Sequence, residues 1–252
     1  MIDSVAIRRI ATSFFVLPNE APPALQFIQK DCHMLILSHR GYQASSHENT
    51  LAAFEAAISL GVDGVETDIR VTVDGLPILF HDRLIDGTIP VESLTLDELI
   101  HRTQKPVPLL EEALHAFPNI LWDLEIKTET ALEPTINVLT RFADTSTFLI
   151  TSFWHNIVKE ACRRLNVRGG LLVAHSPLNI TDLADSLLGD TRCNTIVWDW
   201  ETCTRAHVAH TIARGIDSYV YGLETQEEFD QFKSWGGIGI ITDHPQLFTR
   251  GR

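Results

Sequence analysis

Eight short runs of apolar and β-branched residues recur along the chain. They lie at 34–39, 64–70, 120–126, 147–152, 170–175, 195–200, 218–223 and 237–242. Apolar runs of this length are typical of strands that are buried on both faces of a parallel sheet. The pattern therefore predicts eight strands of one buried sheet.

Stretches with helical spacing of apolar residues separate most of these strands. The predicted helices cover 49–60, 108–117, 131–142, 154–165, 180–188, 205–214 and 226–235. Thr225 is a suitable N-cap for the last helix, whose first turn is acidic, as the helix dipole favours. Asn49 or Thr50 caps the first helix, and Gly61 ends it.

The alternation of strands and helices predicts an α/β protein with a parallel sheet. Eight βα units in 252 residues favour closure into a TIM (β/α)8 barrel, which often forms a single domain of this length. A doubly wound open sheet is the alternative, but the first strand is followed by neither a GxGxxG motif nor a Walker loop. The barrel domain is predicted to span 34–252. The irregular segment 1–33, which holds three prolines, is predicted to pack on it.

One excursion interrupts the alternation. About fifty residues separate the second and third of the eight strands. The sequence PILFHD at 77–82 predicts a short extra strand or extended segment, and 83–106 a short insertion with one or two helical turns. In a barrel, an insertion after the second strand would lie over the face formed by the carboxyl ends of the strands.

The composition limits the classes of partner. A net charge of −13 argues against nucleic acid or an anionic membrane, whereas a metal ion and a few cations can still reverse the field locally for a small anionic substrate. The four cysteines lack CxxC spacing, which favours free thiols in a reducing compartment over a zinc site. No apolar run reaches the roughly 18 residues that span a bilayer, and the first 23 residues lack the order of a secretory signal. We expect a cytoplasmic protein without integral membrane association.

Acidic residues at the ends of two predicted strands carry the candidate chemistry. Glu66 and Asp68 share one face of a strand, because side chains alternate along it, and Asp123, Glu125 and Lys127 share one face of the next. The apolar residues between them suit the side that packs under helices. The acidic residues and Lys127 are therefore expected to point into the barrel near its carboxyl mouth, where active sites of this fold lie.

Carboxylates that point into one space repel one another and need a counter-charge. An oxygen-rich set without cysteine suits Mg²⁺ or Ca²⁺, with Glu66, Asp68 and Glu125 as candidate ligands. The alternative is a buried ion network in which Arg40, Lys127 and Arg70 neutralise the same carboxylates.

Two histidines also end predicted strands. His39 is followed by Arg40, and His81 by Asp82. A pair of histidines suits a reaction that needs a base and an acid, such as phosphoester cleavage. Arg40 and Lys127 are candidate phosphate ligands, and their alternative is simple pairing with Glu48 and Asp123.

These motifs, taken in order, resemble the glycerophosphodiester phosphodiesterase family. They are HRG at 39–41, ENT at 48–50, ExD at 66–68, HD at 81–82 and ExK at 125–127. VDGLPILFHD, VPLLEEAL and ITDHP resemble further segments of the family. The resemblance is dense over 35–127 and thin afterwards.

The resemblance implies a TIM barrel that hydrolyses glycerophosphodiesters to glycerol 3-phosphate and an alcohol. By the match of motifs, Glu66, Asp68 and Glu125 would hold the divalent metal, and His39 and His81 would form a general acid/base pair. Arg40 and Lys127 would bind the phosphate of a small glycerophosphodiester, and Glu48 and Asn49 would support these groups.

Other functions stay open. The same barrel could act as a lysophospholipase D or sphingomyelinase D-like enzyme, or as a non-catalytic barrel that binds a phosphorylated ligand. The family's usual proline before ENT is His47 here, and the insertion at 83–106 is short, so the alcohol is undetermined. Four aromatic residues are candidates for the pocket wall or, alternatively, for core packing: Phe153, Trp198, Trp200 and Tyr221.

Overall fold

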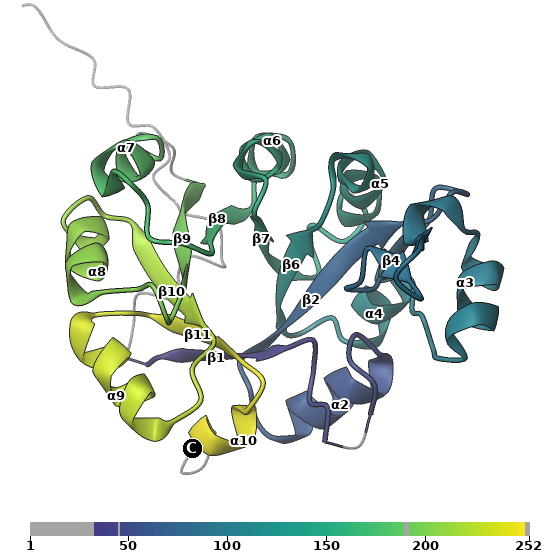
Figure 1. The fold of residues 1–252 in the computed structure, drawn as a ribbon, viewed down its shortest axis with the longest axis horizontal. Coiled ribbons are helices and arrows are strands. Elements are labelled where there is room, and N and C mark those ends of the chain that lie inside the picture. Colours follow the sequence, from purple (N-terminus) through teal and green to yellow (C-terminus); the bar gives the residue numbers. More distant parts are fainter. Residues whose placement is uncertain (1–32, 45, 189–191, 250–252) are drawn as a thin grey trace, which may run out of the picture. The chain divides into compact units, whose positions relative to one another are not determined.

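A closed barrel of eight parallel strands forms the centre of the protein in the computed structural model (Figure 1). The structure describes residues 33–44, 46–188 and 192–249, so the prediction for the segment 1–33 falls, apart from its last residue, outside the described residues. The barrel strands, in order around the ring, are β1 (Leu35–His39), β2 (Gly64–Val71), β6 (Leu121–Ile126), β7 (Thr147–Ser152), β8 (Arg168–Val173), β9 (Cys193–Asp199), β10 (Asp217–Tyr221) and β11 (Gly239–Thr242). Parallel pairing of β1 with both β2 and β11 closes the ring, and the predicted TIM barrel is confirmed.

Helices surround the barrel on its outside (Figure 1). They are α2 (Leu51–Ser59), α4 (Leu110–Ala116), α5 (Glu129–Leu139), α6 (His155–Leu165), α7 (Ile180–Asp185), α8 (Arg205–Ile212), α9 (Gln226–Trp235) and α10 (Pro245–Phe248). Thr50 rather than Asn49 caps α2, because its hydroxyl accepts a hydrogen bond from the Ala53 N–H. Thr225 caps α9 as predicted, in a capping box with Glu228.

Strand alternation separates the apolar and polar faces near the site as predicted. Ile69, Leu124 and Ile126 are fully buried in one apolar cluster with residues of α2, α4, α5 and α6. The charged residues of β2 and β6 lie on the opposite faces of their strands, toward the barrel interior. Below them, an apolar layer that includes Leu37 and Tyr219 fills the interior. This packing supports the polar residues from beneath.

The excursion after β2 begins with a strand that reverses direction. β3 (Pro77–Leu79) runs antiparallel to β2 and pairs with residues 69–71. β1 is too short to reach that part of β2, since its pairs end at His39 opposite Glu66. β3 therefore takes up the edge of β2 that β1 leaves unpaired, and the chain after β3 runs back toward the end of β1.

The rest of the excursion is more ordered than the predicted loop with one or two helical turns. It contains a hairpin of β4 (Leu84–Ile85) and β5 (Ile89–Pro90), a 3-10 turn η1 (Val91–Ser93), and the helix α3 (Leu96–Thr103). These elements bury a small apolar cluster of their own, and α3 has a capping box. No helix in the described part of the chain has the length and apolar character needed to span a membrane.

Candidate active site

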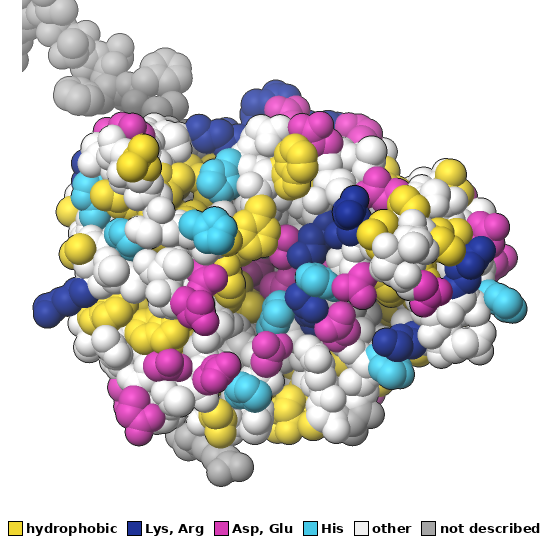
Figure 2. Space-filling view, in the orientation of Figure 1, with side chains coloured by type: hydrophobic (Ala, Val, Ile, Leu, Met, Phe, Trp, Pro, Cys, Tyr) yellow, Lys and Arg dark blue, Asp and Glu magenta, His cyan; other side chains and the backbone are white. Residues whose placement is uncertain are grey.

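Charged and imidazole side chains gather where the barrel strands end. Figure 2 shows acidic, basic and histidine side chains around a hollow at the centre of the barrel. The groups come from β1, β2 and β6 and from the segments that follow β1, β3 and β11. Sequence positions as far apart as His39 and Asp243 therefore meet in one place.

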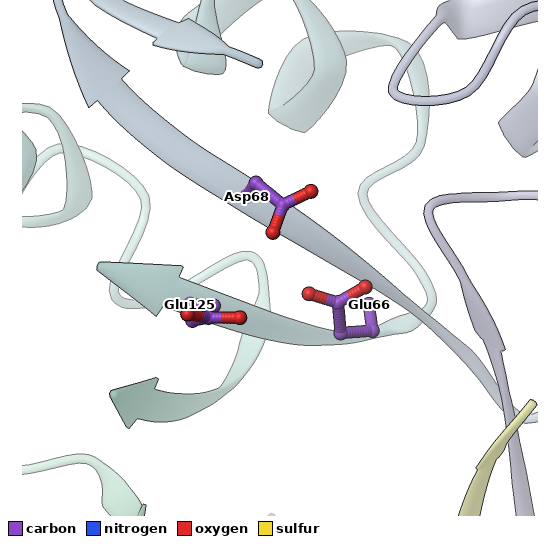
Figure 3. A group of neighbouring side chains, drawn as sticks. All are labelled: Glu66, Asp68 and Glu125. Carbon is purple, nitrogen blue, oxygen red and sulfur yellow. The ribbon is translucent and has the colours of Figure 1, made fainter. Parts of the chain in front are cut away.

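Three buried carboxylates form the centre of this site. Glu66 and Asp68 lie on β2 and Glu125 on the neighbouring β6, where Asp68 and Glu125 are paired in register. One oxygen from each residue lies within 4.8 Å of the others (Figure 3). Their burial leaves little water to screen the repulsion among them.

Two cations neutralise part of this charge. The Lys127 Nζ atom lies 2.7 Å from Asp68 Oδ1 and 2.7 Å from Glu125 Oε2. The Arg40 Nε atom lies 3.1 Å from Asp68 Oδ2, and its Nη1 atom donates to Glu48 at 3.0 Å. Arg40 therefore forms the ion pair with Glu48 that the sequence offered as an alternative to phosphate binding. In the described structure, the ion pairs of Lys127 are with Asp68 and Glu125 rather than with Asp123.

The charges of the site are unevenly balanced. Burial would raise the pKa of Asp68, but Lys127 and Arg40 overcome this effect and hold it below its ordinary value. Burial and the neighbouring carboxylates raise the pKa of Glu66 well above its ordinary value, and burial also raises that of Glu125. Glu66 therefore lacks an adequate counter-charge.

A divalent cation fits this arrangement. The three candidate ligands offer only oxygen atoms, which Mg²⁺ and Ca²⁺ prefer. Lys127 already serves Asp68 Oδ1 at 2.7 Å, whereas Glu66 is short of positive charge, because burial and the neighbouring carboxylates raise its pKa well above the ordinary value. In the described structure, the close ion-pair partners of these carboxylates are Arg40, Lys127 and His39, so Arg70 does not complete the ion network weighed as an alternative.

Each candidate histidine is paired with an aspartate through the same ring nitrogen. His39 Nδ1 lies 2.8 Å from Asp243 Oδ1, and His81 Nδ1 lies 2.9 Å from Asp82 Oδ1. A carboxylate at Nδ1 favours the tautomer with the proton there, which leaves Nε2 available for proton transfer. The Nε2 atom of His39 lies 3.8 Å from Glu66, so this nitrogen faces the carboxylate cluster.

The two histidines lie along the same edge of β2, on chain segments that run in opposite directions. His39 ends β1 and is opposite Glu66, while the chain after β3 returns past Asp68, whose carbonyl accepts a hydrogen bond from the Phe80 N–H at 3.0 Å. His81 is the next residue. The reversal made by β3 is therefore what brings a second histidine to the end of β1.

Asn49 holds the central carboxylate in place. Its side-chain amide donates to Asp68 Oδ2 at 2.8 Å, and its carbonyl accepts from the Thr67 hydroxyl at 2.6 Å. Asn49 adopts φ 56°, a left-handed conformation that asparagine tolerates better than most residues. The residue considered as a helix cap thus supports the site instead.

The turn after β1 requires glycine at position 41. Arg40 and Gly41 both have positive φ, and a Cβ atom on Gly41 would lie 2.7 Å from the Ala53 carbonyl carbon. We expect Gly41→Ala to lower the free energy of unfolding by about 2–4 kcal/mol through backbone strain and overpacking.

Gly61→Ala is the matched control for this prediction in urea unfolding. Gly61 has the same φ of +81°, but a Cβ atom there meets nothing within 4 Å. This variant should cost only about 1 kcal/mol, the strain of the left-handed conformation alone. Equal losses in the two variants would contradict the proposed clash with Ala53.

Asp123 is a fully buried carboxyl group beneath the cluster. It accepts a hydrogen bond from Thr151 at 2.6 Å, and burial raises its pKa to about 8. The folded state therefore keeps a proton on Asp123 between about pH 4 and 8, where the unfolded chain has lost it. Linkage then requires this group to lower the stability as the pH rises through that range.

Asp123→Asn tests this effect because asparagine is neutral at every pH. In urea unfolding with a chelator present, the variant should gain about 1–3 kcal/mol relative to the wild type between pH 5 and 7.5. Parallel stability curves for the two proteins over this range would show that Asp123 is ionised in the folded state.

The candidate aromatic residues divide between core and site. Trp198 is buried under α8, where it stacks on His207 at 5.1 Å, and Trp200 stacks on Trp235 at 5.3 Å. Both tryptophans pack against helices, which favours core packing over a pocket wall, and Trp200 is only partly buried there. Tyr221 belongs to the barrel interior and donates to Asp199 at 3.3 Å, while Phe153 is 47% exposed.

Sequence reasoning missed two residues of the site. Asp243 lies in the ITDHP segment, which we matched to the family without giving this residue a role, and it is the partner of His39. Its position directly after the last strand was the available signal. Arg70 was considered only as a counter-ion, but its Nε atom donates to the His81 carbonyl at 2.8 Å.

A closed parallel barrel with this polar cluster at its carboxyl mouth defines a TIM-barrel protein with a candidate hydrolytic site. Residues 39–167, which include all the residues proposed as ligands or catalysts, match the model of the glycerophosphoryl diester phosphodiesterase family. The chain belongs to this family, and the prediction that it is an enzyme of this class is confirmed.

Similar proteins cover nearly the whole chain. A probable glycerophosphodiester phosphodiesterase 2 of Mycobacterium tuberculosis is 27% identical over 89% of this chain and 92% of its own length. A protein of Rattus norvegicus named lysophospholipase D GDPD1 is 25% identical over 94% of this chain and 91% of its own. The crystal structure of a glycerophosphodiester phosphodiesterase from Thermotoga maritima has a TM-score of 0.76 at 23% identity, covering 87% of this chain and 99% of that one. This structural likeness supports the fold.

Proposed function

We propose that the protein hydrolyses glycerophosphodiesters to glycerol 3-phosphate and an alcohol with the help of a divalent cation. The observation that carries the proposal is the buried group of Glu66, Asp68 and Glu125, flanked by two cations and two carboxylate-paired histidines. Membership of the glycerophosphoryl diester phosphodiesterase family supports the same reaction.

Each group has a distinct role in this proposal. Glu66, Asp68 and Glu125 hold Mg²⁺ or Ca²⁺, which would stabilise negative charge on the phosphoryl oxygens. Arg40 and Lys127 bind those oxygens, Arg40 through its planar guanidinium and Lys127 as a point charge. Both cations are largely buried, so water screens them little.

His39 and His81 form the general acid/base pair. One Nε2 atom takes the proton from the attacking hydroxyl as the new P–O bond forms, and the other gives a proton to the alcohol oxygen as the old bond breaks. The attacking hydroxyl belongs either to water, which gives glycerol 3-phosphate directly, or to the glycerol carbon next to the phosphate ester. The second route gives a cyclic phosphate, which water then opens to glycerol 3-phosphate. Asp243 and Asp82 orient the two rings and stabilise their protonated forms.

A substrate panel tests this function. Purified protein, stripped with a chelator and supplied with Mg²⁺ or Ca²⁺, is given glycerophosphocholine, glycerophosphoethanolamine and glycerophosphoglycerol, and release of glycerol 3-phosphate is measured. We expect turnover only after a metal is restored. Full turnover in the chelator, or no release from any diester with either metal, would overturn the proposal.

One observation favours a second candidate, lysophospholipase D activity. Phe153 and Trp154 follow β7, and Leu178 lies in the segment after the adjacent β8; their exposed fractions are 47%, 51% and 107%. These residues lie at the carboxyl end of the barrel, where an apolar rim would suit the acyl chain of a lysophospholipid.

The two candidates differ in the effect of this rim. If an acyl chain binds there, a Phe153→Ser, Trp154→Ser double variant should lose about 10- to 100-fold in kcat/KM on lysophosphatidylcholine and little on glycerophosphocholine. Ile212→Ser is the control. Ile212 is also 47% exposed, but it is the last residue of α8 and belongs to none of these loops. Equal effects on both substrates would exclude the rim as an acyl site.

A further inference from the structure

His81 belongs to no helix or strand, so backbone hydrogen bonds of such an element do not hold it in place. It follows β3 rather than belonging to it, and its side chain is 36% exposed. Two contacts hold it among the described residues: the ring is bonded to Asp82, and the carbonyl accepts a hydrogen bond from Arg70. Asp82 is itself 66% exposed, so the contact with Arg70 is the better-buried of the two.

Arg70 reaches this carbonyl from the strand that carries the metal-ligand candidates. It lies on β2 two residues after Asp68 and is 7% exposed, so strand alternation places it on the same face as the carboxylates. Its Nε atom lies 2.8 Å from the His81 oxygen. A buried guanidinium is costly unless nearby charges offset its lost hydration.

Several carboxylates lie near Arg70, but none of the described ones forms an ion pair with it. Burial lowers the pKa of Arg70, and four carboxylates oppose this effect only in part: Glu92, Asp68, Glu125 and Asp82. Glu92 in turn accepts hydrogen bonds from Thr128 at 2.8 Å and Thr130 at 3.1 Å. Glu92 thus links the excursion, which also contains His81, to the segment after β6, which begins with Lys127.

We propose that Arg70 is a positioning residue for the reaction and fixes the backbone of His81 at the mouth of the barrel. The guanidinium directs its Nε–H at the carbonyl, and the neighbouring carboxylates offset part of the cost of burying its charge. The expected effect of Arg70 on turnover rests on the proposed function. The expected effect of Arg70 on the position of the His81 imidazole does not depend on the substrate.

A purely structural role is the competing explanation, and the chain offers a matched control for it. Arg168 is also 7% exposed and also lies on a barrel strand, but its guanidinium is bonded to Asp217 and Thr195 at the amino end of the barrel. Arg168→Met removes a buried guanidinium far from His81. It should lower stability and leave the kinetics of the folded protein within about threefold of the wild type.

The kinetic test combines Arg70→Met, Arg70→Lys and the double variant with His81→Ala. Arg70→Met should lower kcat about 10- to 100-fold with little change in KM, as expected when a catalytic group is misplaced by about 1 Å. Arg70→Lys, which keeps a donor and a charge, should recover part of the loss. In the His81→Ala background, Arg70→Met should cost almost nothing further, because the two residues act as one unit.

A spectroscopic test does not depend on turnover. In protein labelled with ¹³C at the histidine Cε1 atoms, the resonance missing from His81→Ala identifies His81. Arg70→Met should shift or broaden this resonance and leave that of His39 in place, whereas Arg168→Met should change neither. Arg70→Lys repeats the measurement if the methionine variant does not fold.

The outcomes separate this proposal from the proposed function. An unmoved His81 resonance in a folded Arg70 variant, or equal losses from Arg70→Met with and without His81, would overturn the positioning role. A wild-type protein that cleaves no phosphodiester would overturn the proposed function, while a displaced His81 resonance would still support the role of Arg70.

Discussion

His39→Ala and His81→Ala should each lower kcat by about 10²- to 10⁴-fold, the range for loss of a general acid or base. Both variants should fold, because the two side chains are 30% and 36% exposed and contribute little to the core. The measurement is release of glycerol 3-phosphate from glycerophosphocholine at saturating metal, with circular dichroism to check folding. His101→Ala on the exposed face of α3 is the control and should keep full activity.

The choice of leaving group separates the acid from the base. A diester with a nitrophenolate leaving group needs no proton on departure, so it should restore most of the turnover of the variant that lacks the acid. The variant that lacks the base should stay slow with both substrates. Full turnover of folded His39→Ala and His81→Ala on glycerophosphocholine would remove both residues from the mechanism.

Glu66→Gln should weaken Mg²⁺ or Ca²⁺ binding by at least about 10-fold, because a neutral amide replaces one of three carboxylate ligands. Turnover should fall with it. In the metal-free protein the same substitution should raise the melting temperature by a few degrees. It removes a charge that burial and the neighbouring carboxylates disfavour, as the raised pKa of Glu66 indicates. A metal site therefore predicts that Glu66→Gln stabilises the metal-free protein, whereas an ion network that needs no metal predicts that the substitution destabilises it.

Thermal unfolding with and without metal measures both effects. A cation at 100 times its dissociation constant should stabilise the wild type by about 2.7 kcal/mol and Glu66→Gln much less. Glu133→Gln, an exposed partner of Arg164 on α5, should respond to metal like the wild type. If metal-free Glu66→Gln loses stability and divalent cations stabilise neither protein, the carboxylates form an ion network without a metal.

Part of the site follows from local sequence rules. Glu66 with Asp68, and Glu125 with Lys127, are two residues apart on strands, so alternation alone places each pair on one face. Parallel strands in a barrel end at the same side, which brings the two pairs near each other. The grouping of Glu66, Asp68 and Glu125 is therefore predictable without knowing any contact between distant segments.

The counter-charges of the site are not predictable in this way. Alternation favours Glu125 as a partner of Lys127, because the two are neighbours on one face at the end of β6. Only the register of β6 against β2 adds Asp68 as the second partner. Arg70 could neutralise the carboxylates, but the reversal at β3 places the His81 carbonyl within its reach instead. Both outcomes depend on pairing between strands.

The tryptophans show the same limit for packing. Trp198 and Trp200 end a strand near the mouth, which suits a pocket wall as well as a core. In the structure α8 and α9 bring His207 and Trp235 onto them, so both rings stack on residues of helices. Which side of a strand end is covered depends on where later helices pack.

The sequence by itself determined the barrel, the positions of its strands and the polar residues at their ends, because periodicity and strand-end location are local properties of the chain. The tertiary structure alone decided the distant partners: Asp243 for His39 across 204 positions, Arg70 for His81, and Lys127 for Asp68. The physical reason is that hydrogen bonds and ion pairs between distant segments form only when strand register and chain reversals bring their atoms within about 3 Å.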